Sequence, residues 1–466
     1  MGMAFGSINT GLPKNIVGQI IAAERDPINK LEGRKGKLNE KNQLLNELNN
    51  LVKELRTDVE KNANAKDFAE LKVITNEEIV NVTVDKDFAK PGEYQMEVKN
   101  LAKKSSAMTT AFEDPDESYV GVGFIQYQLP NGEGESVYVD EDHASLRGVM
   151  NLINARPDAG LKANLINDGK DGNNQWRLIL TLTKTGDNNR AEFPYFYFVD
   201  GEDDFSLEEQ REAMDAVVNL DGFDMELHEN SSKDLIPGLN IEFKKAKPGE
   251  EFTIRIVQDF PIVKDKVKSI VDKVNKVLTF INVQNTLNEK SDTSRTLGGD
   301  LTLQTLQGKI RDVVFSPVLT REGSRRLGDY GIKFQKTGLL ELDEKKLEAQ
   351  LSKEFITVTD FMTGYFDKEE EIQHEGFLSK LTEITKQMIR IPDGPLMLRK
   401  DGIRKSIDQI DSQIANKERI LAQREQMLKD KFARLEGAMS KLKSQGAGLA
   451  SLSAGVDPIT QLAGAN

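Results

Sequence analysis

Both ends of this chain carry an apolar residue at every seventh position, and this feature most restricts how the sequence can fold. Near the N-terminus the repeat runs through Leu31, Leu38, Leu45, Val52 and Val59. Near the C-terminus it runs without interruption through Ile407, Ile414, Leu421, Leu428, Leu435, Leu442 and Leu449. A seven-residue repeat keeps one stripe of a long helix facing a partner. We therefore expect a long helix at each end of the chain.

The C-terminal stripe differs from that of a freestanding two-stranded coil. Its companion seam position holds Ile403 and Ile410, but then Lys417, Arg424 and Lys431. A helix of about 45 residues would be roughly 65 Å long. Burial of its narrow stripe offsets only part of the entropy that ordering so much backbone costs, even with helical hydrogen bonds and propensity added. We infer that the terminal helices become ordered by packing against each other and against neighbouring subunits.

The central part of the chain has the pattern of β-strands. Apolar and polar residues alternate in 80–84 and 94–98 on either side of a Pro-Gly turn, and again in 239–243 and 252–256 around another. Alternation of this kind predicts strands, and the turns predict two hairpins. Because the hairpins flank a long insertion, we expect one β domain with strands from both sides of it.

The inserted region mixes helix and strand signals. We expect a helix at Ser145–Ala155, strands at Leu161–Ile166 and Trp176–Leu182, and a short helix at Glu208–Val218. Helical periodicity returns after Ile262.

The expected fold is α+β and multidomain, with long coiled-coil-like terminal helices, a helical domain, and two nested β-rich domains inserted between them. The domain boundaries that we predict are 1–45 with 400–466 for a terminal leg, 46–75 with 262–399 for a helical domain, 76–110 with 231–261 for a β-rich head domain, and 111–230 for an inserted outer head domain.

Composition restricts the function. The 466 residues are 30% charged with a formal net charge of -13, and basic residues are interleaved with acidic ones, so nucleic-acid binding is disfavoured. There is no cysteine, which excludes disulfides and thiolate metal sites. No apolar run reaches the roughly 18 residues of a membrane span, so no membrane insertion is expected. The first residues lack the basic and apolar regions of a cleavable signal.

Motifs of catalysis and metal binding are weak. The segment Asp168–Asn174 lacks the acidic ligands of a calcium loop, so we interpret it as a turn. The three histidines, His143, His228 and His374, have no paired ligand at metal spacing. Gly121-Val122-Gly123 does not continue into a dinucleotide-binding pattern. We expect no enzymatic activity, no cofactor and no metal.

Several segments resemble the flagellar hook-associated protein 2 family, the capping proteins of bacterial flagellar filaments. The matching segments are Gly11–Val17 with Ala23–Ile28, Pro91–Ala102, Ser145–Ala155 with Ala163–Gly169 (similar to the repeat of flagellar axial proteins), Asp234–Gly238, and Gly299–Arg311. The most specific match is Gly331–Asp343. Pro13 stands where the family usually has Asp.

The resemblance implies a structural role at the distal tip of the flagellum, after secretion through the flagellar type III export channel. The protein would form a homo-oligomeric ring that retains flagellin and promotes its insertion into the growing filament. Its partners would be other copies of itself, flagellin, hook–filament junction proteins, and an export chaperone at the C-terminal helix. The residues expected to make helix-packing and filament contacts are Leu31, Leu38, Leu45, Val52, Ile407, Ile414, Leu421, Leu428, Leu435 and Leu442.

Two other functions compete with this one. Another flagellar axial protein, at the hook–filament junction or in the filament itself, would share the terminal helices. A coiled-coil scaffold unrelated to flagella would share the seven-residue stripes alone.

Overall fold

A computed structural model describes most of the chain, in two compact units. The described residues are 15–128, 134–156, 160–169, 175–190, 192–200, 205–286 and 292–453. One unit comprises 1–65 with 264–466, and the other comprises 66–263. Segments from both ends of the chain therefore meet in the first unit, and the expected α+β multidomain class is confirmed.

The first unit is mainly helical. Its helices are α1 (Ile16–Glu24), α2 (Asp26–Lys61), α5 (Phe260–Asn285, which begins in the second unit), α6 (Leu301–Phe315), α7 (Glu344–Thr363), α8 (Phe377–Ile389) and α9 (Pro395–Ser453). The short helix α3 (Ala65–Phe68) spans the boundary. Pro27 lies in the first turn of α2, where its missing amide donor costs nothing, so the break between α1 and α2 falls just before it.

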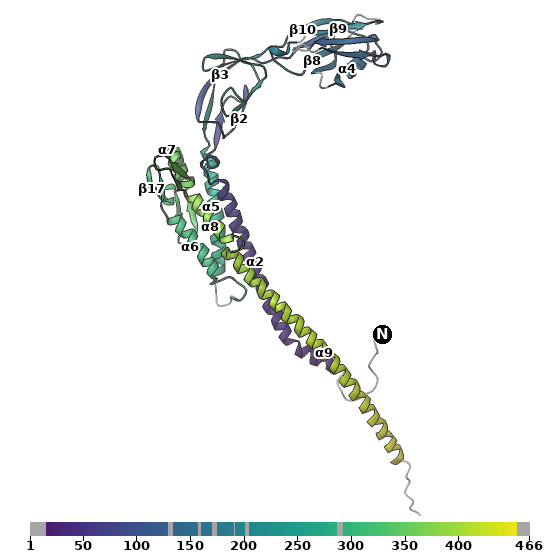
Figure 1. Ribbon diagram of the computed structural model, residues 1–466, viewed down its shortest axis with the longest axis vertical. Coiled ribbons are helices and arrows are strands. Elements are labelled where there is room, and N and C mark those ends of the chain that lie inside the picture. The colour runs from purple at the N-terminus through teal and green to yellow at the C-terminus, as the bar shows by residue number, and fades with distance from the viewer. Residues whose placement is uncertain are drawn as a thin grey trace, which may run out of the picture. The chain divides into compact units, whose positions relative to one another are not determined.

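Part of the core of the first unit lies along α2. Leu45, Leu48, Val52 and Leu55 are buried there, at the three- and four-residue spacing that aligns side chains on one helix face. Helix α2 packs against α8 and α9, so chain segments more than 300 residues apart lie side by side (Figure 1).

Small hairpins connect these helices. They are formed by β16 (Val318–Thr320) with β17 (Gly323–Arg325), β18 (Ile332–Phe334) with β19 (Leu340–Leu342), and β20 (Gly364–Asp367) with β21 (Ile372–Glu375). Gly331 precedes β18 at a φ of 86°, and a Cβ there would stand 2.8 Å from the carbonyl oxygen of Asp343. Asp343 in turn caps α7 by accepting from the amide of Lys346. The segment Gly331–Asp343 therefore builds a compact hairpin-to-helix joint.

The inner strands of the second unit form two sheets. One has the order β1 (Leu71–Ile74), β15 (Phe252–Gln258), β3 (Gly92–Asn100), β11 (Ala216–Leu220), β12 (Phe223–Leu227), and the other has the order β13 (Ser231–Ser232), β14 (Leu239–Phe243), β2 (Val80–Val84).

The strands expected at 80–84, 94–98, 239–243 and 252–256 are present, but the two predicted hairpins are wrong. β2 pairs with β14 and β3 pairs with β15, so each Pro-Gly turn leads from one sheet to the other. This crossing lets the alternating apolar residues of both sheets face one core, which includes Val80, Met96, Ile241 and Ile254. Strands from both sides of the insertion thus pair with each other.

The outer strands surround a second core. One sheet has the order β10 (Leu207–Arg211), β4 (Ser106–Thr109), β8 (Trp176–Leu182), β7 (Leu161–Asn167), and the other has the order β6 (Gly134–Val139), β5 (Gly123–Gln128), β9 (Glu192–Phe198). Helix α4 (Leu146–Asn154) packs on β7 and β8, capped by Ser145, whose hydroxyl accepts from the amide of Gly148. The helix and both strands expected here are confirmed.

The helix expected at Glu208–Val218 is wrong. That segment contains most of β10 and the start of β11, which belong to different sheets. Ala213 between the two strands and Ala216 and Val218 on β11 are buried, so tertiary burial outweighed a spacing that resembled a helix turn. The turn expected at Asp168–Asn174 lies outside the described residues from 170 onward.

Two glycines in turns beside the inner sheets differ in how much room they have for a side chain. Gly238 and Gly249 both have left-handed φ, 80° and 83°. A Cβ on Gly238 would stand 2.1 Å from the amide nitrogen of Ala89, whereas nothing lies within 4 Å of one on Gly249.

We expect Gly249→Ala to lower the free energy of unfolding by about 1 kcal/mol, the cost of a left-handed alanine. Gly238→Ala should cost more than about 2 kcal/mol, because the clash with the backbone adds to the same φ penalty. Urea unfolding followed by circular dichroism measures both. Equal losses in the two variants would contradict the packing around Gly238.

Candidate functional site

The N-terminal stripe is largely covered within the first unit. Leu31, Leu45 and Val52 are buried, with exposed fractions of 8%, 1% and 0%, and Leu38 is half-buried. Helix α2, which carries them, packs mainly against α8 and α9. Most of this stripe therefore holds the unit together and is not available to another molecule.

The C-terminal stripe becomes more exposed along α9. Ile407, Ile414, Leu421 and Leu428 are half-buried, while Leu435 and Leu442 are exposed by 44% and 67%. Leu449 lies outside the residues whose side chains are described. The structure thus separates the predicted site residues of α9 into a partly covered group and a free group. Four further large apolar side chains in the described part of α9 are exposed as well: Leu398, Ile420, Met427 and Met439.

Ion pairs set the antiparallel register of α9 against α1 and α2. Arg424 Nε lies 2.7 Å from Glu24 Oε1, and Lys35 Nζ lies 2.5 Å from Asp411 Oδ1. A third pair joins Arg25 to Glu418 at 3.6 Å. Their side chains are about one-third or more exposed, and such pairs contribute about 0–1 kcal/mol each. These ion pairs therefore contribute more to the register of the helices than to the stability of the unit.

The start of α9 is held more firmly. Asp300 caps α6 by accepting from the amide of Thr302, and its other oxygen accepts from Arg399 Nε at 2.7 Å. Burial alone would raise the pKa of Asp300, but these two hydrogen bonds hold it below its ordinary value. Ile403 and Ile410, at the companion position of the stripe, are buried one and three turns further on. Helix α9 is therefore anchored at its N-terminal third and free toward its C-terminal end.

Sequence reasoning underestimated the companion position. Ile403 and Ile410 are the best buried residues of α9 after Leu396, and Arg424 uses its charge in the pair with Glu24. The sequence did contain a pattern that indicates this burial: two isoleucines seven residues apart, followed by basic residues at the next companion positions. That change marks the place where coverage by α2 ends.

A group of possible metal ligands lies on the hairpin β20–β21. Ligand atoms of Asp367, Glu370 and His374 are within 4.8 Å of one another. The carboxylate of Asp367 already accepts from the amides of Glu369 and Glu370, which lowers its pKa. The geometry is that of a capped turn.

Within residues 15–453, apart from the gaps given above, no helix has a stretch both long and apolar enough to cross a membrane.

Sequence profiles of one protein family match both parts of the chain. The profile of the flagellar hook-associated protein 2 N-terminus matches residues 11–105, and that of the C-terminus of the same family matches residues 213–444. Together these matches cover well over half of the chain. They include α1, α2, the inner strands and most of α9.

Individual proteins agree with the profiles. A B-type flagellar hook-associated protein 2 of Pseudomonas aeruginosa is 27% identical, with 78% of each chain covered. An A-type protein of the same name and organism is 27% identical, with 87% of each chain covered. The crystal structure of the D1–D2–D3 domains of the flagellar cap protein from Escherichia coli has the same fold, with a TM-score of 0.58 at 20% identity, covering 78% of this chain and all of that one. The chain therefore belongs to the flagellar hook-associated protein 2 family.

Proposed function

We propose that this protein caps the distal end of the bacterial flagellar filament. Copies of the chain form a ring that retains exported flagellin and promotes its insertion into the filament. The observation that carries the proposal is the match of both family profiles, in the correct order, on helices and strands that come from the two ends of the chain. Relatives of nearly the same length bear the same family name.

The C-terminal part of α9 that carries Leu435 and Leu442, called here the free end of α9, is the part of the protein that we assign to contacts with the filament. Leu435 and Leu442 are exposed on a helix whose beginning is anchored by Asp300 and Ile403. Exposed leucines at seven-residue spacing on one stripe suit a helical partner. The other predicted contact residues of α9, Ile407, Ile414, Leu421 and Leu428, would extend this surface, while Leu31, Leu38, Leu45 and Val52 hold the helices together.

The remaining predicted partners are part of the same proposal. The free end of α9 is accessible to an export chaperone before secretion, and hook–filament junction proteins would be neighbours during assembly. Export through the flagellar type III channel would place the protein outside the cell at the flagellar tip. The function is mechanical, so we propose no catalytic activity.

We also propose that the two compact units contain four functional parts with the boundaries predicted from the sequence. Residues 1–45 with 400–466 would form the leg, and 46–75 with 262–399 the helical domain. Residues 76–110 with 231–261 would form the inner head domain, and 111–230 the outer one. Four strands cross these bounds, because β1, β11 and β12 pair in an inner sheet and β4 pairs in an outer sheet. The pairing of β2 with β14 and of β3 with β15 supports the joining of 76–110 to 231–261.

Electron microscopy of the purified full-length protein tests the proposed function. A cap predicts discrete rings of uniform size, and tagged protein should lie at filament tips in cells. Long helical polymers would favour a filament subunit, and label at the hook–filament junction would favour a junction protein. Protein that stays inside cells whose flagellar assembly is disturbed would favour an unrelated scaffold.

A further inference from the structure

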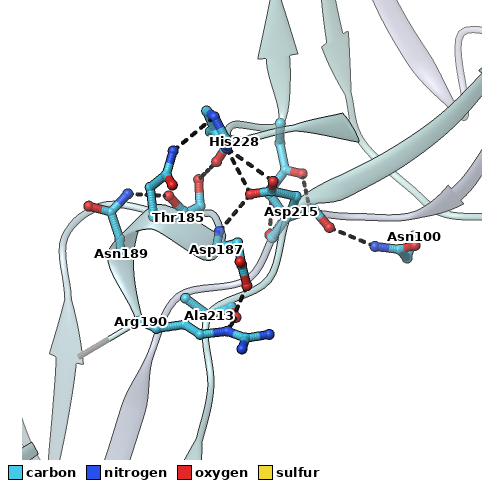
Figure 2. A network of polar contacts seen from close by, with 11 residues as sticks. Asn100, Thr185, Asp187, Asn189, Arg190, Ala213, Asp215 and His228 are labelled. Atoms are coloured by element: carbon cyan, nitrogen blue, oxygen red, sulfur yellow. Dashed lines mark hydrogen bonds and ion pairs between the residues drawn. The ribbon is translucent and has the colours of Figure 1, made fainter. Parts of the chain in front are cut away.

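The inner and outer sheets of the second unit are connected by more than the chain itself. The chain passes outward between β3 and β4 and returns between β10 and β11. A further connection is non-covalent: the outer loop Thr185–Arg190 meets His228, which follows the inner strand β12 (Figure 2).

Hydrogen bonds centre on His228 and on Asp215, a residue of the returning segment. The Nδ1 atom of His228 lies 3.0 and 3.1 Å from the two carboxylate oxygens of Asp215. The same carboxylate accepts from the backbone amide of Asp187 at 2.6 Å. Thr185 donates its hydroxyl to the carbonyl oxygen of His228 at 2.7 Å, and Asn188 Nδ2 lies 3.0 Å from His228 Nε2. One histidine–aspartate pair therefore holds the outer loop from two sides (Figure 2).

The loop is shaped to fit closely against His228. Gly186 has a φ of 97°, and a Cβ there would stand 2.6 Å from the carbonyl oxygen of His228. The amide of Gly186 donates to the carbonyl oxygen of Lys103 in the outgoing segment, and Asn189 Nδ2 donates to that of Thr185. The loop thus contacts both crossing segments and the end of β12.

Three further charged groups act on His228 and Asp215. Asp187 on the loop and Glu226 on β12 act on His228 together with Asp215, and Arg190 acts on Asp215. The hydrogen bond to Asp215, then its charge, raises the pKa of His228 above the ordinary value. Burial would raise the pKa of Asp215, but the His228 hydrogen bond and the Asp187 amide outweigh it and lower that pKa.

We propose that His228, Asp215 and the loop Thr185–Arg190 form a clasp whose hold on the outer sheets strengthens when the His228 imidazole is protonated. In the neutral ring, Nδ1–H donates to Asp215 and Nε2 accepts from the Asn188 amide. Protonation turns the first contact into an ion pair, and Asn188 presents its carbonyl oxygen to Nε2–H after an amide flip.

The direction in which pH changes the stability of the clasp follows from the directions of the pKa shifts of His228 and Asp215. The contribution of His228 is complete below its unfolded value of about 6.5 and is lost as pH rises through its higher folded pKa. The contribution of Asp215 is complete above its unfolded value of about 3.8 and is lost as pH falls through its lower folded pKa. The clasp is therefore tightest in mildly acidic solution and loosens at alkaline pH.

Fluorescence energy transfer between the inner and outer sheets tests the clasp in the full-length protein. The chain has no cysteine, so Lys90→Cys on the inner side and Lys162→Cys on the outer side provide unique labelling sites. We expect the distribution of distances between the two labels to be narrower at about pH 5.5 than at about pH 8.5. The His228 imidazole titrates between these values, and its protonated form holds the outer sheets more firmly. His228→Gln should lose this narrowing, and so should Asp215→Asn.

The other histidine of the second unit supplies a matched control. His143 pairs with Asp140 at 2.6 Å, but that pair lies within a single turn and bridges nothing. His143→Gln should therefore keep the pH-dependent narrowing. His228 is more than half exposed, so its replacement leaves the core intact, and circular dichroism verifies this for each variant.

The proposal is overturned if the distributions of the parent protein are equally wide at both pH values. It is also overturned if His228→Gln keeps the narrowing, or if His143→Gln loses it to the same extent as His228→Gln. A nuclear magnetic resonance titration gives a second readout, in which the midpoint of the His228 ring should lie above 6.5. A midpoint at or below that value contradicts the ion pair.

Discussion

Replacing Leu435 and Leu442 together by serine should abolish filament assembly while leaving the protein as stable as before. Both side chains are exposed, by 44% and 67%, so the folded chain loses no core contact. Burying a leucine against a partner contributes about 1.5–3 kcal/mol, so losing two would weaken filament binding by about 3–6 kcal/mol, more than a hundredfold. Filament length and swimming of cells that carry only the variant measure the effect.

Substitutions elsewhere on α9 supply the control. Arg434→Ser and Lys441→Ser change exposed residues of the same helix outside the apolar stripe. Together they should leave filaments close to normal length. Normal swimming of the double leucine variant would remove the free end of α9 from the proposed mechanism, and so would an equal loss in the control.

Replacing Arg177 by methionine should produce the largest loss of stability in the second unit. Arg177 lies on β8 and is only 5% exposed. Its Nε donates to Asp168 Oδ2 at 2.6 Å at the end of β7, and its Nη1 donates to the carbonyl oxygen of Thr109 on β4 and to Glu208 on β10. One guanidinium therefore ties together all four strands of this sheet.

The expected cost is about 3–5 kcal/mol, because Asp168, whose side chain is only 9% exposed, keeps its charge after losing the ion pair with Arg177. Adding Asp168→Asn to Arg177→Met should recover part of the loss, because the buried carboxylate charge that faced Arg177 is removed. The protein's single tryptophan, Trp176, is adjacent to Arg177 and half-buried in the same sheet, so its fluorescence during urea unfolding reports this region directly.

Arg147→Met is the matched control for Arg177→Met. Arg147 donates to both carboxylate oxygens of Asp116, at 2.5 and 3.1 Å, but both side chains are about half exposed. Because water screens such a pair, its loss should lower the stability far less than the loss of Arg177. Similar losses in the two variants would show that Arg177 is not held as a buried charge.

Local patterns predicted the elements better than their partners. The seven-residue stripes predicted α2 and α9, because helix periodicity depends only on near neighbours. Alternation likewise predicted the four inner strands. It failed for their pairing, since a Pro-Gly turn is compatible both with a hairpin and with a crossing between two sheets. The choice depends on which arrangement buries both apolar faces, and that involves strands about 160 residues apart.

The candidate site also has a part that local patterns predicted and a part that they did not. Leu435, Leu442 and the rest of the stripe were identified from spacing, but spacing is identical for a residue that faces its own protein and for one that faces another. The clasp was beyond sequence reasoning, because His228, Asp215 and Thr185 share no periodic pattern and are brought together by strand crossings.

The sequence by itself thus determined the helical ends, the β-rich middle, the acidic cysteine-free surface and the family. These properties come from residue type and from short-range order along the chain. Tertiary structure alone decided that β2 pairs with β14, that Ile403 and Ile410 are covered, and that Leu435 and Leu442 are exposed. The physical reason is that burial depends on all the segments that meet at one place, and those segments are far apart in sequence.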